Sequence, residues 1–151
     1  MMFSGKKPFV VAVSLLSLLG FAPYANSAHA KAAQELVWES DVDKVMEEGR
    51  HLNKYVLADV YTTWCVPCKK MDKTTFEDAG LRSFLNDHFV CLKVNAEDKG
   101  AGEKFAENNK VGMFPTSLVF TPQGKLLGKV TGFKTAEQFR NDLDALLQRA
   151  Q

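Results

Sequence analysis

The sequence lacks an excess of charge of either sign. Its 151 residues include 19 basic and 18 acidic side chains. Residues 1–30 hold two lysines and no acidic residue, so residues 31–151 carry 17 basic against 18 acidic side chains, a net charge of −1. Such a balance gives no electrostatic attraction for nucleic acid or for an acidic surface. We therefore expect no nucleic-acid partner.

Internal repeats, low-complexity tracts and linkers are also absent from the sequence. A chain of 151 residues is the length of one domain. With 46% hydrophobic residues and eleven phenylalanines, it can form a core that does not need disulfide bonds to hold it together.

The first 30 residues do not read as part of that core. Lys6 and Lys7 precede an apolar stretch, residues 9–21, and a segment of small residues ends in Ala28-His29-Ala30. This order is typical of a secretory signal peptide. The apolar stretch is short for a membrane span, which needs about 20 residues; an uncleaved anchor is the alternative. No cysteine lies near the proposed cleavage site, so lipid modification of the N-terminus is not expected. We expect residues 1–30 to be a signal peptide and no stable membrane insertion after its removal.

Cysteines are few, and their number is odd. Cys65 and Cys68 lie in the segment YTTWCVPCKK, and Cys91 stands apart. The pair has three interpretations: a redox couple, a structural staple, or half of a zinc site with the spacing C-x2-C-x19-H-x2-C, completed by His88 and Cys91. A three-residue step closes almost no loop and adds little stability. Zinc ligand pairs usually sit on tight turns, whereas Cys91 lies inside an apolar run, so redox chemistry is favoured.

Strands and helices alternate along the rest of the chain. The first predicted helix is capped by Ser40 and runs to about Gly49, and the second begins near Cys65. Two further helices are predicted over about 81–86 and over 101–109. The fifth and last helix follows a capping box formed by Thr135 and Gln138. The predicted strands are 55–61 and 89–96, followed by a hairpin of 116–120 and 125–132. This order predicts an α/β fold, a mixed central sheet with helices on both faces.

The chemistry of the cysteine pair follows from its place between a predicted strand and a predicted helix. A sulfur at a helix N-terminus meets unpaired N–H groups and the positive end of the helix dipole, which favour the nucleophilic thiolate. Pro67 suits the first helical turn. Cys65 is then expected to attack a partner's disulfide and Cys68 to release the product. The dipeptide Val66-Pro67 offers no cation to stabilise the thiolate further, which favours an electron donor or a disulfide shuffler.

Two segments carry a resemblance to a known family. ADVYTTWCVPCKKM, residues 58–71, resembles the active-site segment of thioredoxins, and VGMFPTSLVF, residues 111–120, resembles their proline loop. The likeness covers about residues 35–149, and the Val-Pro dipeptide departs from the usual Gly-Pro. Residues 68–98 look closest to small exported thioredoxin-like proteins and to the C-terminal domain of the bacterial membrane reductase that supplies the periplasm with electrons. The resemblance implies the thioredoxin fold over residues 31–151 and a periplasmic location.

The resemblance also assigns roles to polar residues. Asp59, on the buried strand, would accept a proton from Cys68, and desolvation should raise its pKa. Lys93 matches the family's lysine near that carboxylate, and as a buried charge it needs such a partner. The alternative places Asp59 at a strand end facing solvent.

The residues around the proline loop are expected to bind the substrate. Pro115 matches the family's cis-proline, which would expose the backbone of Phe114 to an extended substrate segment. Phe114 would add an apolar lip, and Trp64 would cover one side of Cys65. For both aromatic residues the alternative is core packing.

The expected function is an exported protein-disulfide oxidoreductase, acting as a reductase or an isomerase on protein thiols and disulfides. No metal and no separate cofactor are expected, because the Cys65–Cys68 pair carries the electrons, and a membrane electron donor is the implied partner. Alternatives are an oxidant that introduces disulfides and a module that binds thiols or zinc without turnover. Lys69 and Lys70 are expected to be solvated. Cys91 is expected to be a buried thiol, with a role as third redox partner as the alternative.

Overall fold

The computed structural model describes residues 35–150, and the expected signal peptide, residues 1–30, lies outside the described residues. The elements in order are β1 (Trp38–Glu39), α1 (Val42–Leu52), β2 (Tyr55–Tyr61), α2 (Val66–Lys73), α3 (Ala79–His88), β3 (Phe89–Asn95), α4 (Ala101–Asn108), β4 (Thr116–Phe120), β5 (Leu126–Thr131) and α5 (Ala136–Gln148). No helix within residues 35–150 has the length and apolarity that crossing a membrane requires.

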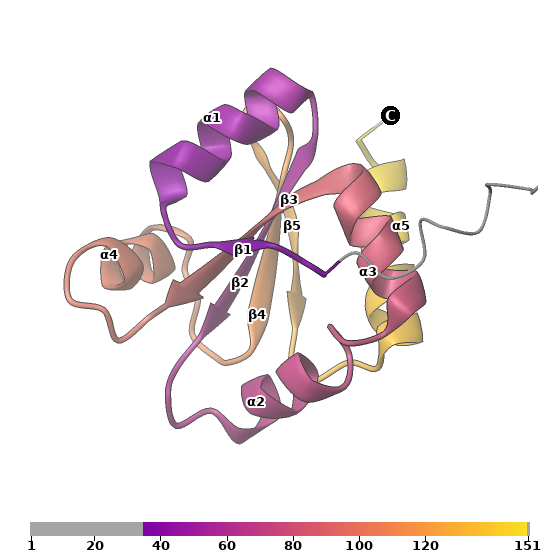
Figure 1. Ribbon diagram of the computed structural model, residues 1–151. Coiled ribbons are helices and arrows are strands. Elements are labelled where there is room, and N and C mark those ends of the chain that lie inside the picture. The colour runs from indigo at the N-terminus through magenta and orange to yellow at the C-terminus, as the bar shows by residue number, and fades with distance from the viewer. Residues whose placement is uncertain (1–34, 151) are drawn as a thin grey trace, which may run out of the picture.

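The sheet is mixed, as the sequence predicts. Its five strands lie in the order β1-β3-β2-β4-β5. β3 runs parallel to both β1 and β2, whereas β4 is antiparallel to β2 and β5 is antiparallel to β4. The long strand β2 therefore lies at the centre, between a parallel and an antiparallel neighbour (Figure 1).

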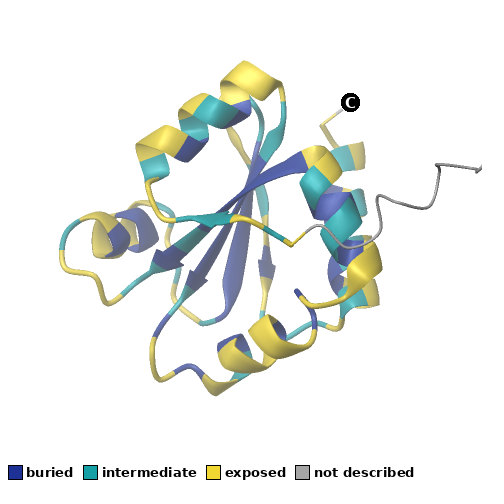
Figure 2. Cartoon of the chain, viewed as in Figure 1, coloured by how far each residue is buried: buried dark blue, intermediate teal, exposed yellow. Residues whose placement is uncertain are grey.

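Two apolar clusters cover the two faces of this sheet. On one face, Val56, Ala58 and Val60 of β2 pack with residues of α1 and α4. On the other face, Leu57 packs with residues of α2, α3 and α5, among them Met71 and Phe139. Successive side chains of a strand point to opposite faces, so one strand supplies both clusters. Helices on both faces are thereby confirmed, and Figure 2 shows the buried strands between helices whose outer sides are exposed.

Local capping decides where several helices begin. The capping box of Thr135 and Gln138 at α5 is confirmed. The Ser40 cap is wrong: Asp41 is the N-cap of α1, its side chain accepts a hydrogen bond from the Lys44 N–H at 3.0 Å, and the helix continues past Gly49 to Leu52. A carboxylate also complements the helix dipole, so Asp41 is the better acceptor of the two.

Two further elements differ from the sequence prediction. The helix expected over 81–86 spans Ala79–His88, because the Asp78 side chain caps it by accepting a hydrogen bond from the Leu81 N–H at 2.8 Å. The short edge strand β1, Trp38–Glu39, was missed. A strand of two residues contains no alternation that a sequence pattern could reveal.

Gly102 allows α4 to lie against the end of β3. A Cβ at this position would overlap the backbone carbonyl oxygen of Asn95 and crowd the side chain of Asp98. The turn that follows β3 carries Glu97, which contacts the cysteine loop. The close approach at Gly102 therefore fixes a segment that reaches the site described below.

We expect Gly102→Ala to lower the free energy of unfolding by about 1–3 kcal/mol, because overpacking against a fixed backbone strains the fold. Equilibrium urea unfolding of the oxidised protein measures this. Gly112→Ala is the matched control, since a Cβ there meets no heavy atom within 4 Å. Equal unfolding midpoints for the two variants would contradict the packing argument.

Candidate active site

Cys65 occupies the junction between β2 and α2. It is the N-cap residue of α2, which begins directly after it at Val66, with Pro67 in the first turn. The Cys65 sulfur forms a disulfide with Cys68, with a Cα–Cα distance of 5.3 Å. The Cys65 Sγ also accepts a hydrogen bond from the Cys68 N–H at 3.2 Å. The helix dipole and this N–H both favour negative charge on the Cys65 sulfur once the bond is reduced.

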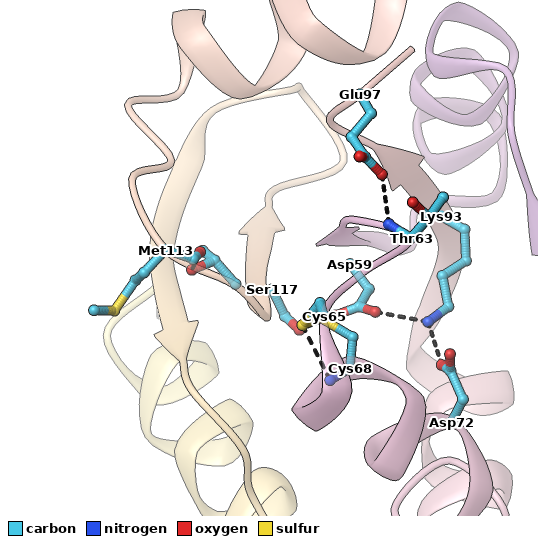
Figure 3. Close-up of a disulfide and its surroundings, with 10 residues drawn as sticks. Asp59, Thr63, Cys65, Cys68, Asp72, Lys93, Glu97, Met113 and Ser117 are labelled. Carbon is cyan, nitrogen blue, oxygen red and sulfur yellow. Dashed lines mark hydrogen bonds and ion pairs between the residues drawn. A yellow bond between two sulfur atoms is a disulfide. The ribbon is translucent and has the colours of Figure 1, made fainter.

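A buried carboxylate lies on the central strand, on the face that α2 covers. Asp59 follows Leu57 on the face of β2 that packs against α2, and only 1% of the residue is exposed. The alternative that Asp59 faces solvent is therefore wrong. Figure 3 shows its carboxylate on the side of β2 where the disulfide and α2 lie.

The two strands beside β2 supply the partners of Asp59. In register, Asp59 stands opposite Lys93 of β3 and Ser117 of β4. Lys93 Nζ donates to Asp59 Oδ2 at 2.7 Å, and Ser117 Oγ donates to Asp59 Oδ1 at 2.7 Å. Each carboxylate oxygen therefore has its own donor, as a buried charge requires.

Burial has the larger influence on the pKa of Asp59, and the acidic partners have the larger influence on that of Lys93. Loss of solvent raises the pKa of Asp59 above its ordinary value of 3.8, and the ammonium of Lys93 and the hydroxyl of Ser117 offset only part of that rise. Burial by itself would lower the pKa of Lys93, but its contacts with Asp59 and Asp72 outweigh burial and raise that pKa above 10.5. Lys93 therefore stays charged, and Asp59 binds a proton more readily than an exposed carboxylate.

Lys93 has a second acidic partner and three aromatic neighbours. Its Nζ also donates to Asp72 Oδ1, on α2. The same Nζ lies 4.7 Å from the ring centroid of Trp38, 4.9 Å from that of Phe76 and 5.5 Å from that of Tyr61. Cation–π contacts of this kind hold an ammonium group where it is partly desolvated.

Exposed apolar side chains lie on both sides of Cys65 in the sequence and in the segment before Pro115. Trp64, Val66 and Met113 are exposed by 66%, 74% and 61%, so the core-packing alternative for Trp64 is wrong. Phe114 is half-buried, packs against the α1/α4 cluster, and meets Trp64 edge-on at 5.9 Å between ring centroids. The Phe114–Pro115 peptide bond is cis.

The loop before Cys65 is held by Glu97, which follows β3. Its Oε2 accepts a hydrogen bond from the Thr63 N–H at 2.5 Å (Figure 3). Hydrogen bonds from the backbone and side chain of Thr63, and a smaller contribution from the Trp64 side chain, lower the pKa of Glu97 below 4.5. Glu97 thus remains an acceptor in mildly acidic solution and keeps the Thr63–Trp64 segment in place.

The four residues of the zinc alternative are not brought together. Within residues 35–150, no three His, Cys, Asp or Glu side chains lie so that they could hold a metal ion. β2 and β3 are parallel, and Tyr55 pairs with Phe89. His88 thus lies where β2 begins, whereas the disulfide follows the strand's other end. Cys91 is 3% exposed, and burial raises the pKa of its thiol to about 12, as expected of a buried thiol.

Sequence reasoning missed Asp72, Ser117, Glu97 and Trp38. The predicted hairpin pairs the strand of Ser117 with the strand that follows it, and this prediction does not place Ser117 beside β2. Asp72 follows Cys68 by four residues, one helical turn, but on a lysine-rich helix this spacing is also that of a solvated face. The contact of Glu97 with Thr63 joins two loops, which no local pattern reveals.

Comparisons with known proteins agree with this geometry. A family model described as a thioredoxin-like domain matches residues 42–147. The chain is similar to the thiol:disulfide interchange protein DsbD of Ralstonia nicotianae, 34% identical over 115 residues, and to that of Actinobacillus pleuropneumoniae, 36% identical over 130 residues. These matches cover 74% and 80% of this chain but 19% and 22% of the relatives. The chain thus spans about a fifth of the length of these relatives.

Solved structures share the fold. A DsbH oxidoreductase matches with a TM-score of 0.67 and 19% identity, covering 84% of this chain and 94% of its own. A thioredoxin from Thermus thermophilus matches with a TM-score of 0.68 and 20% identity over 76% and 88% of the two chains. A putative disulphide-isomerase from Bacteroides thetaiotaomicron reaches 0.65 and 26%, over 76% and 97%. The thioredoxin fold expected from the sequence is confirmed.

The raised pKa of Asp59 determines whether this residue makes the fold more or less stable as pH rises. Between 3.8 and the raised pKa, the folded chain binds more protons than the unfolded chain. The free energy of unfolding therefore falls as pH rises through that window. Asp59→Asn removes this slope, so we expect the stability of the variant relative to the native protein to increase with pH.

Urea unfolding of both oxidised proteins from pH 4 to pH 9 measures this difference. The range lies below the titration of Lys93, whose own raised pKa acts only in alkaline solution. Asp43→Asn, at an exposed position, is the control for the loss of one carboxyl group from the chain. A parallel curve for Asp59→Asn would show that burial does not perturb this carboxyl.

Proposed function

This chain belongs to the thioredoxin-like family, and from that premise we propose that it is a thiol:disulfide oxidoreductase whose substrates are protein thiols and disulfides. The observation that carries the proposal is the Cys65–Cys68 disulfide at the N-terminus of α2, next to the buried Asp59. The relatives named as thiol:disulfide interchange proteins support it.

In the reducing direction, the thiolate of Cys65 attacks one sulfur of a client disulfide. A mixed disulfide forms, and the client's other sulfur leaves as a thiolate, which takes a proton from solvent. The Cys68 thiol then gives its proton to the Asp59 carboxylate and attacks the Cys65 sulfur. The mixed disulfide breaks, the client's second thiolate leaves, and the Cys65–Cys68 bond forms. Two electrons pass to the client, so the pair needs no separate cofactor.

Lys93 and Ser117 serve this step by holding the carboxylate of Asp59. A carboxylate with a raised pKa accepts a thiol proton more readily than an exposed one. The hydrogen bonds fix its orientation, so a proton can be received without rearrangement of the strand. We assign Asp59 as the proton acceptor and Lys93 as its electrostatic partner.

The apolar rim is the proposed docking surface for clients. Trp64, Val66 and Met113 are exposed around the disulfide, and Phe114 and Pro115 form the adjoining edge. Apolar side chains bind other apolar segments, and an extended client can pair with the backbone of Phe114. Such a surface selects unfolded or extended clients rather than a particular charge pattern.

We further propose that the protein works as a reductase or an isomerase in the periplasm, after export by a signal peptide, and receives electrons from a membrane donor. The absence of a cation between Cys65 and Cys68 supports this direction. The equilibrium reduction potential tests it: reductive thioredoxin lies at about −270 mV, disulfide isomerase at about −180 mV and a strong periplasmic oxidant at about −120 mV. A potential near that of the strong periplasmic oxidant would indicate that the protein introduces disulfides instead.

Single cysteine variants test the division of roles. We expect Cys65→Ser to abolish turnover of a protein disulfide, and Cys68→Ser to accumulate a mixed disulfide with the client, visible by non-reducing electrophoresis. Cys91→Ala is the control and should turn over normally, since Cys91 is buried in β3. Turnover by Cys65→Ser would exclude the proposed chemistry.

Trp64→Ala tests the docking surface. We expect the KM for a protein client to rise about tenfold, because loss of an exposed aromatic anchor costs more than about 1 kcal/mol, while turnover of a small-molecule disulfide stays near normal. The control is Val37→Ala, an equally exposed apolar residue beside β1. Equal effects on large and small disulfides would instead assign Trp64 to the chemical step.

A further inference from the structure

The exposed side of α2 carries charges that the proposed function does not use. Val66, Lys69, Lys70 and Lys73 follow one another at intervals of three, four and seven residues from the first, and all four are exposed. Residues with this spacing lie on one side of a helix. This side therefore begins at the docking residue next to Cys65 and continues as three lysines, which we call the lysine stripe.

The lysine stripe is not neutralised by ion pairs within the described part of the chain. Lys44, Lys93 and Lys134 each pair with a carboxylate, whereas no carboxylate of residues 35–150 lies within ion-pair distance of the stripe. Asp72, on the same helix, is bonded to Lys93. The positive charge of the stripe is therefore available to a partner, although the net charge of the chain is close to zero.

The stripe adjoins the proline loop through the segment that joins β5 to α5. Lys70 Nζ lies 4.4 Å from the centroid of the Phe133 ring, a cation–π contact that holds the ammonium in place. The preceding residue, Gly132, donates its N–H to the carbonyl oxygen of Pro115 at 2.8 Å. This segment thus contacts the proline loop at one residue and the stripe at the next, so the stripe continues the proposed docking surface.

A cavity of about 310 Å³ lies between α2 and the same segment. Lys70 and Thr74 line it, together with Phe133 and Ala136. None of the described residues that line it is acidic; Glu137 follows them in the first turn of α5. A carboxylate of a bound segment can therefore reach the Lys70 ammonium through this cavity without displacing an acidic side chain.

Resting on the proposed function, we propose that the lysine stripe selects clients in which acidic side chains flank the reactive cysteine. The client is an extended protein segment that pairs with the backbone of Phe114 and brings its cysteine to Cys65. Its neighbouring carboxylates then contact the ammonium groups of the stripe. The apolar rim by itself does not distinguish charge patterns, so the stripe supplies that preference. Exposed charges of this kind mainly accelerate association and make it dependent on salt.

Two other roles for these lysines are separable from this one. Lys70 and Lys73 lie in the last turn of α2, where cations also stabilise the helix dipole. That role changes the stability of the fold but not the choice between clients. An anionic membrane is a second partner that such charges fit. The position of the stripe beside Val66 and the proline loop favours a client of the disulfide.

The test uses two synthetic peptides whose single cysteine is linked by a disulfide to mercaptoethanol. In one peptide the cysteine is flanked by glutamates, and in the other by glutamines. At low salt we expect the reduced native protein to show a kcat/KM about tenfold higher for the glutamate peptide. A variant with Lys69→Gln, Lys70→Gln and Lys73→Gln should lose this ratio. Raising the salt from about 10 mM to about 300 mM should also remove most of it, because exposed charges are then screened.

The matched control is a variant with Arg50→Gln, Lys104→Gln and Lys125→Gln. It loses the same charge at exposed positions on α1, on α4 and in the turn before β5, and it should keep the ratio. Equal rates for the two peptides in the native protein, a ratio that survives loss of the stripe, or a ratio lost in the control would each overturn the proposal.

Vesicles of anionic lipid separate the membrane from the client. Binding of the native protein but not of the stripe variant, together with equal rates for the two peptides, would assign the lysines to a lipid surface and overturn the client preference. If the native protein reduced neither peptide, the proposed function would fail and the client preference with it. Reduction of both peptides at the same rate would contradict the preference alone.

Discussion

A carboxylate buried in the centre of the sheet is the constraint on which the rest of this site depends. Burying an ionised group without partners costs several kcal/mol, so Asp59 requires a donor for each oxygen. The mixed sheet meets this need: the parallel neighbour β3 brings Lys93 into register and the antiparallel neighbour β4 brings Ser117. A shift of β4 by one residue would turn Ser117 to the opposite face. Strand order and register are therefore part of the chemistry.

The disulfide depends on the same strand. β2 ends at Tyr61, and the loop that follows places Cys65 at the start of α2. Glu97 holds that loop through the Thr63 N–H. The helix terminus favours a thiolate at Cys65, whereas Cys68 lies one turn further along α2. Both residues are buried, at 3% and 2% exposed, so their place on the helix and not their burial distinguishes them. In the proposed function, Asp59 is the base that takes the proton of Cys68.

Local features of this fold could be predicted from the sequence, and long-range ones could not. The central strand, the capping box at Thr135 and the helix start after Cys65 each depend on a few adjacent residues. The zinc alternative is wrong because it rested on the spacing of ligands along the sequence, which does not give distances in space. The parallel register of β2 and β3 places His88 where β2 begins, whereas Cys65 follows the end of β2.

Lys93 and Asp59 were paired in advance only through the family resemblance, and neither composition nor periodicity indicated the remaining partners of Lys93. Trp38 lies in a strand of two residues, too short for a pattern. Asp72 lies on the exposed side of α2, where charged side chains are ordinarily solvated. Their convergence on one ammonium group results from tertiary packing, which single-sequence patterns do not encode.

The ammonium of Lys93 stabilises the ionised form of Asp59 and thereby opposes the uptake of a proton by this carboxylate. Burial favours the protonated form of Asp59, whereas the ammonium of Lys93 favours the ionised form. As the proposed proton acceptor, Asp59 must exist in both forms during one cycle, and its raised pKa shows that burial has the larger influence. Lys93 also bonds to Asp72, and the negative charge of Asp72 raises the pKa of Asp59 further. Burial and the charge of Asp72 thus act together against the ammonium of Lys93, which is why the pKa of Asp59 is raised although its carboxylate is paired.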